Sequence, residues 1–193
     1  VLFAEPDGRF PNHSPNPLDA GATDAATGRV RGARADFGVV FDADGDRAVF
    51  LDERGERIFG DHLFAFFLDR ALAKGDLVLG TVSSSNILRD VAVGRGAEFL
   101  RFSVGRALSA AMREKNARFG GELSGHYYFR DFYFLDDALR MFVEIASLVS
   151  RETATLSELL KPYRKYFHSG EINFEIKDAA AAIEKLKRDY ADG

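Results

Sequence analysis

The chain has 193 residues, of which 46% are hydrophobic and 29% are charged, and its formal net charge is −4. This is enough material for one full domain, or one and a half, with a sizeable buried core. The near balance of 26 basic and 30 acidic residues argues against a nucleic-acid binder and against a polybasic membrane patch. Because the sequence contains no cysteine, disulfides, zinc–thiolate sites, iron–sulfur clusters and cysteine nucleophiles are excluded within it.

The sequence shows no sign of a membrane or secretion signal. No apolar run approaches the roughly 18 residues that cross a bilayer. Residues 1–6 have neither the basic region nor the small-residue cleavage site of a signal peptide. We therefore expect a soluble, globular, cytoplasmic chain, whose oligomeric state the sequence does not indicate.

The first 36 residues show little regular patterning. Residues 1–4 form a short apolar run of the kind found in buried strands. Residues 5–17 hold four of the five prolines, which excludes a helix or a central strand and indicates a loop. Residues 18–36 are rich in Ala, Gly, Asp and Arg, and Gly28 and Gly32 weaken any helix there.

From residue 37 the apolar pattern alternates between strand and helix. Residues 37–41 predict a buried strand, and residues 48–51 and 57–59 predict a hairpin with Gly55 in its turn. Apolar rows at i, i+4 predict a helix over 63–72. Further strands are expected at 77–79, 98–100 and 118–119, and further helices at 86–93, 107–115 and 136–149.

This alternation predicts an α/β fold with a mostly parallel sheet flanked by helices. In such sheets, ligands bind in the loops at the carboxyl ends of the strands. The pattern starts again near the end, where residues 171–176 alternate like a strand and residues 179–190 predict a helix. One strand and one helix are too little for a domain, so residues 169–193 are interpreted as the beginning of another unit.

The strongest chemical signal is the segment Phe41–Arg47 (FDADGDR), in which three aspartates alternate directly after an apolar strand. Clustered carboxylates repel one another unless a cation compensates their charge. Oxygen ligands favour a hard cation, and Asp42, Asp44 and Asp46, with room for a phosphate oxygen, suit Mg²⁺. Arg47 adds a fixed positive charge beside that metal, suited to a phosphate.

Three other interpretations of this aspartate loop are considered. The simplest is a solvated acidic turn. An EF-hand would match the three aspartates and Glu53, but it requires glycine where Arg47 stands and helices as flanks, so it is excluded. A haloacid-dehalogenase-type phosphatase also begins with an apolar strand and Asp-x-Asp, but Asp46 replaces its usual Thr or Val. That phosphatase is kept as the runner-up.

The second signal is the segment Gly120–His126 (GGELSGH), which lies between a short predicted strand and the aromatic residues 127–129. Its three glycines allow a ligand to approach the backbone closely. Glu122, Ser124 and His126 present an acceptor, a hydroxyl and a titratable ring, and a glutamate with hydroxyl groups suits sugar recognition. Taken alone, the segment could also be a structural hairpin with a surface histidine.

The two loops, some eighty residues apart, together resemble the α-D-phosphohexomutases, the bacterial and archaeal phosphomannomutase/phosphoglucomutase family. The segment Gly121–Asp137 (GELSGHYYFRDFYFLDD) looks especially like the phosphomannomutase branch. Residues 7–17 resemble the segment that closes the family's second domain. Leu123 stands where the glucosamine-phosphate branch usually has Gln. The resemblance covers nearly the whole chain.

The resemblance implies four α/β domains around one cleft. It also implies phosphoryl transfer between an active-site phosphoserine and O1 or O6 of a hexose, through a hexose 1,6-bisphosphate that reorients. The substrates would be mannose or glucose 1- and 6-phosphates, which differ between the two sugars only at C2. Carried over residue by residue, it assigns Asp42, Asp44 and Asp46 to Mg²⁺, Arg47 and His126 to catalysis, and Glu122, Ser124 and His126 to the sugar.

The chain departs from the family pattern at two places. The family's serine loop reads like Thr-Ala-Ser-His-Asn-Pro, whereas Pro11–Pro17 reads PNHSPNP, so Ser14 is interpreted as a loop serine. In the segment RFSVGR, Ser103 and Arg106 occupy places where the family usually has Lys and His. Arg106 could still bind phosphate at the start of a helix, but the missing lysine leaves the proton-transfer residue open.

We therefore expect residues 1–20 to end a second α/β domain, residues 21–167 to form the metal- and sugar-binding third domain, and residues 168–193 to start a fourth. The predicted activity is that of an intramolecular phosphotransferase. A chain that lacks the phosphoserine is expected to be inactive alone. The alternatives are the phosphatase and a non-catalytic module that binds Mg²⁺ and sugar phosphates.

Overall fold

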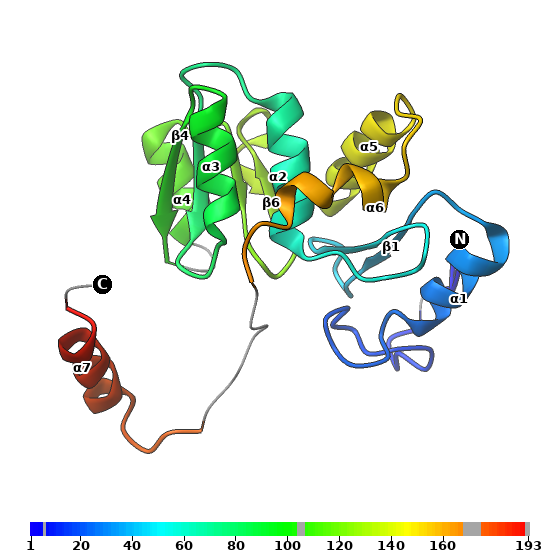
Figure 1. The fold of residues 1–193 in the computed structure, drawn as a ribbon. Coiled ribbons are helices and arrows are strands. Elements are labelled where there is room, and N and C mark those ends of the chain that lie inside the picture. The colour runs from blue at the N-terminus through cyan, green and yellow to red at the C-terminus, as the bar shows by residue number, and fades with distance from the viewer. Residues whose placement is uncertain (6, 104–106, 168–174, 192–193) are drawn as a thin grey trace.

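The computed structural model describes residues 1–5, 7–103, 107–167 and 175–191. The predicted α/β class is confirmed, because a five-stranded sheet is covered by helices and a separate two-stranded sheet lies beside it (Figure 1). Within these described ranges, none of the helices has the length and apolar character needed to cross a bilayer.

The larger sheet has the strand order β4-β3-β5-β6-β7. β3 (Leu77–Thr81) pairs in parallel with β4 (Glu98–Phe102) and with β5 (Phe119–Gly121), as the alternating pattern predicts. β6 (Tyr127–Phe129) and β7 (Leu135–Asp136) are antiparallel, so the sheet is mixed rather than mostly parallel. A parallel connection needs a crossover of about a dozen residues or more, and the loop between β5 and β6 is too short for one.

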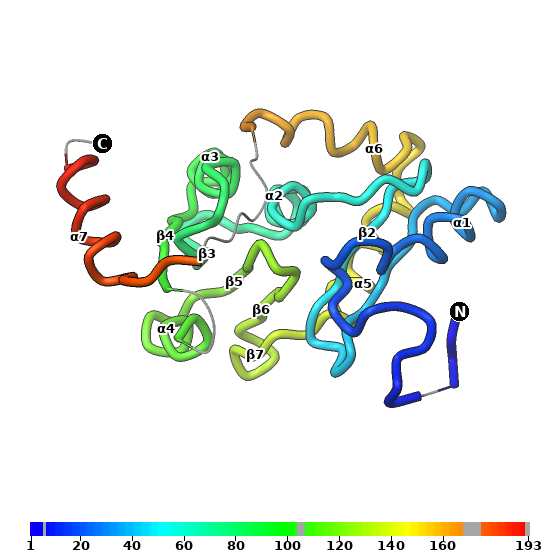
Figure 2. Tube along the Cα trace, turned by 90° about the horizontal axis from the view of Figure 1, so that it is seen from below, coloured from blue at the N-terminus to red at the C-terminus, as the bar shows by residue number. Residues whose placement is uncertain are grey.

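Helices cover both faces of this sheet. α2 (Gly60–Ala71) and α3 (Asn86–Gly94) lie on one face and α4 (Ala107–Lys115) on the other (Figure 2). α5 (Ala138–Val149) packs against α2. The predicted helices agree with these bounds to within a few residues. Shorter elements are α6 (Leu156–Leu159) and the 3₁₀ helices η1 (Arg130–Phe132) and η2 (Lys161–Tyr163).

The main core forms around α2, in which residues 63–68 are all buried. Phe67 makes edge-to-face contacts with Phe119 on β5 and Phe129 on β6, with ring centroids 5.0 and 6.0 Å away. Such pairs contribute about 0.5–1.5 kcal/mol each beyond the area that they bury. They fix the strands on either side of the Gly120–His126 segment against a rigid helix.

The N-terminal region differs from expectation. Residues 1–4 are exposed and form no strand. α1 (Asp24–Ala33) forms although it contains Gly28 and Gly32. Val30 on this helix is 4% exposed and packs over Gly38, where a Cβ would lie 2.6 Å from the Val30 side chain. Burial of an apolar face outweighs the helix cost of the glycines, roughly 1 kcal/mol each.

The two-stranded sheet is a hairpin of β1 (Gly38–Phe41) and β2 (Ala48–Leu51). The aspartate loop is the connection between these antiparallel strands. The hairpin predicted for residues 48–51 and 57–59 is reduced to a single bridge between Leu51 and Arg57, with Gly55 in its turn at φ +71°. The carboxylates therefore follow a hairpin strand and not a strand of the parallel sheet.

α7 (Ala179–Asp189) ends the described chain, as predicted, and buries none of its residues. It lies apart from the sheet and its helices in Figure 1. The strand predicted over 171–176 falls largely outside the described residues, and residues 175–176 are not in a strand.

Candidate functional site

The aspartate loop is organised by Asp42, which is 8% exposed at the end of β1. Asp42 Oδ1 accepts hydrogen bonds from the backbone N–H groups of Gly45 (3.0 Å) and Arg47 (3.1 Å). Asp42 Oδ2 accepts one from Arg47 Nε at 2.6 Å. Gly45 has φ +77°, which glycine adopts without strain. Asp44 is exposed and Asp46 is half-buried.

The pKa values of two loop carboxyls move in opposite directions. Burial raises the pKa of Asp42, but hydrogen bonds from the Arg47 backbone and side chain outweigh burial and hold this pKa below its ordinary value. The pKa of Asp46 is raised, first by burial and then, against the opposing effect of His126, by the negative charges of Asp42 and Asp44. The Arg47 contacts thus stabilise the charged form of Asp42, whereas burial and the neighbouring negative charges disfavour the charged form of Asp46.

The donor set of this loop fits a hard divalent cation. One oxygen from each of Asp42, Asp44 and Asp46 lies within 4.8 Å of the others. Three carboxylates without nitrogen or sulfur ligands suit Mg²⁺ or Ca²⁺. A cation there would also relieve the repulsion that raises the pKa of Asp46.

The Gly120–His126 segment comprises the last two residues of β5 and the connection to β6. The Glu122 N–H donates to the His126 carbonyl at 3.0 Å, and the Gly125 N–H donates to the Glu122 carbonyl at 3.1 Å. Glu122 is 8% exposed, and its Oε1 accepts a hydrogen bond from the Tyr128 hydroxyl at 2.9 Å. The Ser124 hydroxyl oxygen is buried and has no partner among the described residues. A buried hydroxyl without a partner is costly, so Ser124 is suited to bonding a ligand.

The two loops meet through their backbones. Arg47 and His126 form an antiparallel bridge, and the Ala48 N–H donates to the Gly125 carbonyl at 3.1 Å. Gly125 has φ +96°, and a Cβ at this position would lie 2.7 Å from the Ala48 carbonyl oxygen. Only glycine allows the two backbones to come this close, so the glycine at position 125 is what lets the two motifs lie side by side.

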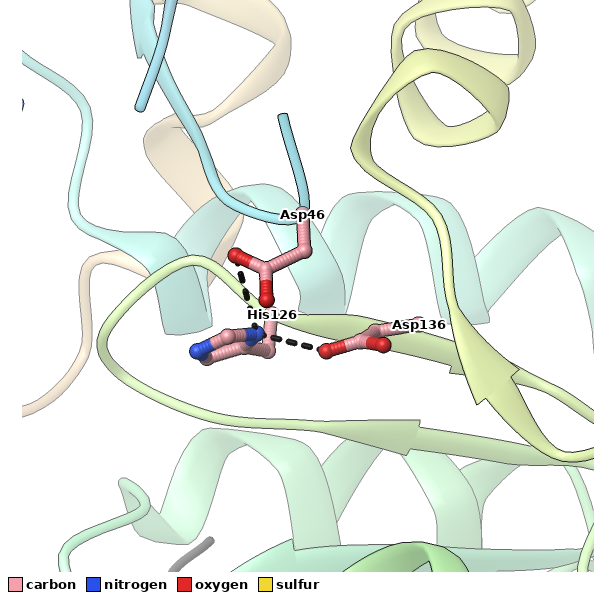
Figure 3. Close-up of side chains that lie close together, drawn as sticks. All are labelled: Asp46, His126 and Asp136. Atoms are coloured by element: carbon pink, nitrogen blue, oxygen red, sulfur yellow. Dashed lines mark hydrogen bonds and ion pairs between the residues drawn. The ribbon is translucent and has the colours of Figure 1, made fainter. Parts of the chain in front are cut away.

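Asp136 is a site residue that the sequence analysis missed. His126 Nδ1 lies 2.7 Å from Asp136 Oδ2 and 3.8 Å from Asp46 Oδ1 (Figure 3). Burial lowers the pKa of His126, but the hydrogen bond to Asp136 and the charges of Asp46 and Asp136 outweigh it and raise this pKa. The β6–β7 register, which pairs Tyr128 with Asp136, brings the carboxylate to the ring. The sequence pattern placed Asp136 at the start of a helix, which in fact begins after Asp137.

A cleft of about 1080 Å³ adjoins the second loop. Glu122 and Ser124 line it, whereas the three aspartates, Arg47 and His126 do not. Its walls come from residues 57–62, 83–86 and 122–125, together with Asn16, Leu18, Asp19, Ala48, Val49, Thr81, Arg101, Tyr166 and Phe167. The structure therefore places two of the three predicted sugar-binding residues, Glu122 and Ser124, in the lining of a cavity, whereas His126 and the predicted metal ligands lie outside this lining.

The remaining predicted residues lie elsewhere. Arg106 falls outside the described residues. Ser14 lies in the proline-rich loop, where its hydroxyl donates to Asp19 at 2.5 Å. The same loop reaches the aspartate loop, because Arg47 Nη1 donates to Asn16 Oδ1 at 3.3 Å. This contact was not predicted, since nothing in the proline-rich segment indicates which side chain it would meet.

Comparison with protein families gives two matches. Residues 59–166 match the sequence model of "Phosphoglucomutase/phosphomannomutase, alpha/beta/alpha domain III", and residues 2–55 match that of domain II. The aspartate loop thus lies in the part matching domain II, and the Gly120–His126 segment in the part matching domain III. The two matches meet at residues 55–59, whereas the sequence analysis set the domain boundary at residue 20.

Individual relatives agree with these matches. The chain is 37% identical over 195 residues to "Phosphohexose mutases" of Xanthomonas campestris pv. campestris, covering 99% of this chain and 44% of the relative. It is 33% identical over 190 residues to a phosphomannomutase of Methanocaldococcus jannaschii, covering 97% and 42%. A solved Phosphoglucomutase/phosphomannomutase family protein from Burkholderia thailandensis superimposes with a TM-score of 0.77 at 30% identity, covering 82% of this chain and 35% of that one. The chain spans less than half the length of the curated relatives it matches.

Proposed function

The chain belongs to the phosphoglucomutase/phosphomannomutase family, and we propose that it supplies the metal-binding and sugar-binding parts of a phosphohexomutase. Such an enzyme interconverts hexose 1-phosphates and hexose 6-phosphates. The observation that carries the proposal is the backbone pairing of the aspartate loop with the Gly120–His126 segment, at Arg47–His126 and Ala48–Gly125. Two motifs some eighty residues apart are thereby held in one place, as a shared reaction centre requires.

In this proposal Asp42, Asp44 and Asp46 hold Mg²⁺. When bound, the metal would neutralise negative charge on a transferring phosphoryl group, which is the main requirement of this chemistry. Arg47 adds a second positive charge, and its contacts with Asp42 and Asn16 keep the guanidinium in a fixed orientation. The phosphoserine would lie outside residues 1–193, since Ser14 is bonded to its neighbours in a loop that does not match the family's.

Glu122 and Ser124 would bind the hydroxyl groups of the sugar. Tyr128 occupies Glu122 Oε1, which orients the carboxylate and leaves Oε2 for a substrate hydroxyl. The unpartnered Ser124 hydroxyl gains its first hydrogen bond from the ligand. His126, held at Nδ1 by Asp136, would present Nε2 to the substrate and give or take a proton there.

The proposed substrates are mannose or glucose 1- and 6-phosphates, with hexose 1,6-bisphosphate as the intermediate that reorients. We propose that residues 2–55 and 59–166 contribute from two neighbouring domains, and that α7 belongs to a following one. The separation of the β1–β2 hairpin from the five-stranded sheet supports this division.

The phosphatase alternative is less well supported. It needs Asp42 as a free nucleophile, but both oxygens of Asp42 accept hydrogen bonds, from Gly45 and Arg47. Asp42 also follows a strand of the two-stranded hairpin, not a strand of the five-stranded sheet. A trapped aspartyl-phosphate that is lost in Asp42→Asn would reinstate the phosphatase.

A chimera tests the mutase proposal. This chain would replace the matching segment of the Methanocaldococcus jannaschii phosphomannomutase, and conversion of mannose 1-phosphate to mannose 6-phosphate would be followed in a coupled assay. We expect turnover by the chimera, none by the chain alone, and a loss of about 100-fold in Glu122→Gln, typical of removing one precisely placed polar group. Cooperative thermal unfolding of each protein checks that it is folded. A folded but inactive chimera would favour the non-catalytic binding module.

A further inference from the structure

Among the residues that the structure describes, two arginines and no lysine line the cleft that contains Glu122 and Ser124. Arg57 donates from Nη1 to the Leu18 carbonyl at 3.0 Å. Arg101 donates from Nη2 to the Ser84 carbonyl at 3.0 Å. Among the described residues, neither guanidinium forms an ion pair with a carboxylate.

Arg101 is held in a fixed position at the carboxyl end of β4. Besides Ser84, its Nη2 contacts Asn86 Oδ1 at 2.8 Å, and the guanidinium lies 5.4 Å from the centre of the Phe99 ring. Its Nε and Nη1 donate to no described atom. Arginine has five N–H donors, so anchoring through Nη2 alone leaves donors available to a ligand.

The turn that holds the Arg101 guanidinium is itself fixed by hydrogen bonds. The Thr81 N–H donates to Ser84 Oγ at 3.0 Å, and the hydroxyls of Thr81 and Ser83 are 2.9 Å apart. The Ser85 side chain accepts the Ile87 N–H and caps α3. A cation anchored on such a turn loses little further freedom when a ligand binds.

The carboxylates that line the same cleft have other partners. Asp61 Oδ2 accepts the Ser85 N–H at 2.6 Å, and Glu122 Oε1 accepts the Tyr128 hydroxyl. Asp19 accepts hydrogen bonds from the Ser14 hydroxyl and the Asn16 amide. Among the described residues, none of these carboxylates is paired with Arg57 or Arg101, so guanidinium N–H donors in this concave polar cleft are available to an anion.

We propose that Arg101, with Arg57 as a second cation, binds a phosphate group of the hexose phosphate in this cleft. Guanidinium groups with free donors are the side chains best suited to phosphate oxygens. Glu122 and Ser124 line the same cleft, so one ligand would meet sugar-binding and phosphate-binding residues together. That the phosphate is carried by a hexose rests on the proposed function, whereas phosphate recognition by Arg101 does not.

Binding is measured on the full 193-residue chain by titration with three probes: glucose 6-phosphate, inorganic phosphate and glucose. The Nε–Hε signals of arginine, followed by ¹H–¹⁵N NMR, report on each guanidinium. We expect saturable shifts of the Arg101 signal with glucose 6-phosphate and phosphate, and none with glucose. Arg101→Ala should weaken glucose 6-phosphate binding about ten-fold or more, since a hydrogen bond between charged groups is lost. Arg101→Lys should give an intermediate value.

Arg113 provides the matched control. Like Arg101, it donates to a backbone carbonyl, that of Tyr133 at 3.1 Å, and lies over an aromatic ring, that of Phe134 at 5.8 Å, but it does not line the cleft. Arg113→Ala should bind all three probes like the wild type. Unchanged glucose 6-phosphate affinity in Arg101→Ala, with cooperative unfolding preserved, would overturn the proposal, and so would equal shifts of the Arg101 and Arg113 signals.

The outcomes separate this proposal from the mutase proposal. Saturable phosphate binding at Arg101 combined with a folded, inactive chimera would support the subsite and contradict the mutase function. Full turnover by a chimera that carries Arg101→Ala would support the mutase function and contradict the subsite.

Discussion

The aspartate loop and the Gly120–His126 segment differ in where their support comes from. Asp42 is held by Gly45 and Arg47, which are at most five residues away. The second loop depends on residues far along the chain or on another strand, because Gly125 bonds to Ala48 and His126 to Asp136. The aspartate loop can be recognised from the spacing of its residues alone, whereas the contacts of the second loop are set by tertiary neighbours.

The largest effect is expected where the two loops touch. Gly125→Ala would place a Cβ 2.7 Å from the Ala48 carbonyl oxygen, on a residue whose φ is +96°. We therefore expect the free energy of unfolding, measured in urea, to fall by about 2–4 kcal/mol. Gly28→Ala is the matched control, since nothing lies within 4 Å of its Cβ position in α1; it should add about 0.5–1 kcal/mol. An unchanged midpoint for Gly125→Ala would show that the loops do not depend on this approach.

A smaller effect should separate structural support from metal binding within the aspartate loop. Asp42→Ala removes a buried acceptor of three hydrogen bonds and should cost about 1–3 kcal/mol. Asp44→Ala, at an exposed position, should change stability by less than about 0.5 kcal/mol. Both should weaken Mg²⁺ binding in calorimetry, as should the triple Asn variant of Asp42, Asp44 and Asp46. Unchanged Mg²⁺ affinity in the triple variant would contradict the metal assignment.

The dependence of His126 on a distant residue can be tested by spectroscopy. In the wild type, Asp136 favours the tautomer of neutral His126 that is protonated at Nδ1. Asp136→Ala should shift the ring toward the Nε2–H tautomer in ¹⁵N NMR and cost about 1 kcal/mol of stability. Asp131→Ala, which breaks the exposed pair with Arg140, should leave the tautomer unchanged. A ring that keeps its Nδ1 proton without Asp136 would show that other groups orient it.

The smallest effect concerns a long-range tether near the aspartate hairpin, the contact of Glu53 with Ser157. Glu53 accepts the N–H and hydroxyl of Ser157, at 3.1 and 2.6 Å. Burial raises the pKa of Glu53, but these hydrogen bonds outweigh burial and hold it below its ordinary value of 4.5. A lowered folded-state pKa means that the stabilisation is present above the unfolded-state pKa and is lost as pH falls through the folded-state pKa.

Wild type and Glu53→Gln should therefore differ most in stability near pH 7, by about 1 kcal/mol or less. The difference should shrink as the pH falls below about 4, where Glu53 becomes protonated in both states. Urea titrations at several pH values measure it. A difference that is independent of pH would show that the Glu53 charge has no part in the tether.

Local patterns accounted for much of this fold. The apolar residues of α2 predicted a helix because they recur at i, i+4 spacing, which places them on one face of a helix. The same reasoning failed for α1, where burial of Val30 outweighs two glycines. It also missed β6 and β7, which were not predicted as strands and which a short loop returns antiparallel to β5.

The sequence by itself determined the α/β class and the family resemblance, and it predicted the aspartate loop as a set of oxygen ligands, because each depends on local patterns or short motifs that can be recognised one at a time. The tertiary structure alone decided that the two loops meet at Gly125 and Ala48, that Asp136 bonds His126, and that Arg101 lines the cleft of Glu122. These contacts join strands and loops through packing and register. No residue pattern on either side specifies its distant partner, because pairing is set by the shape of the whole core.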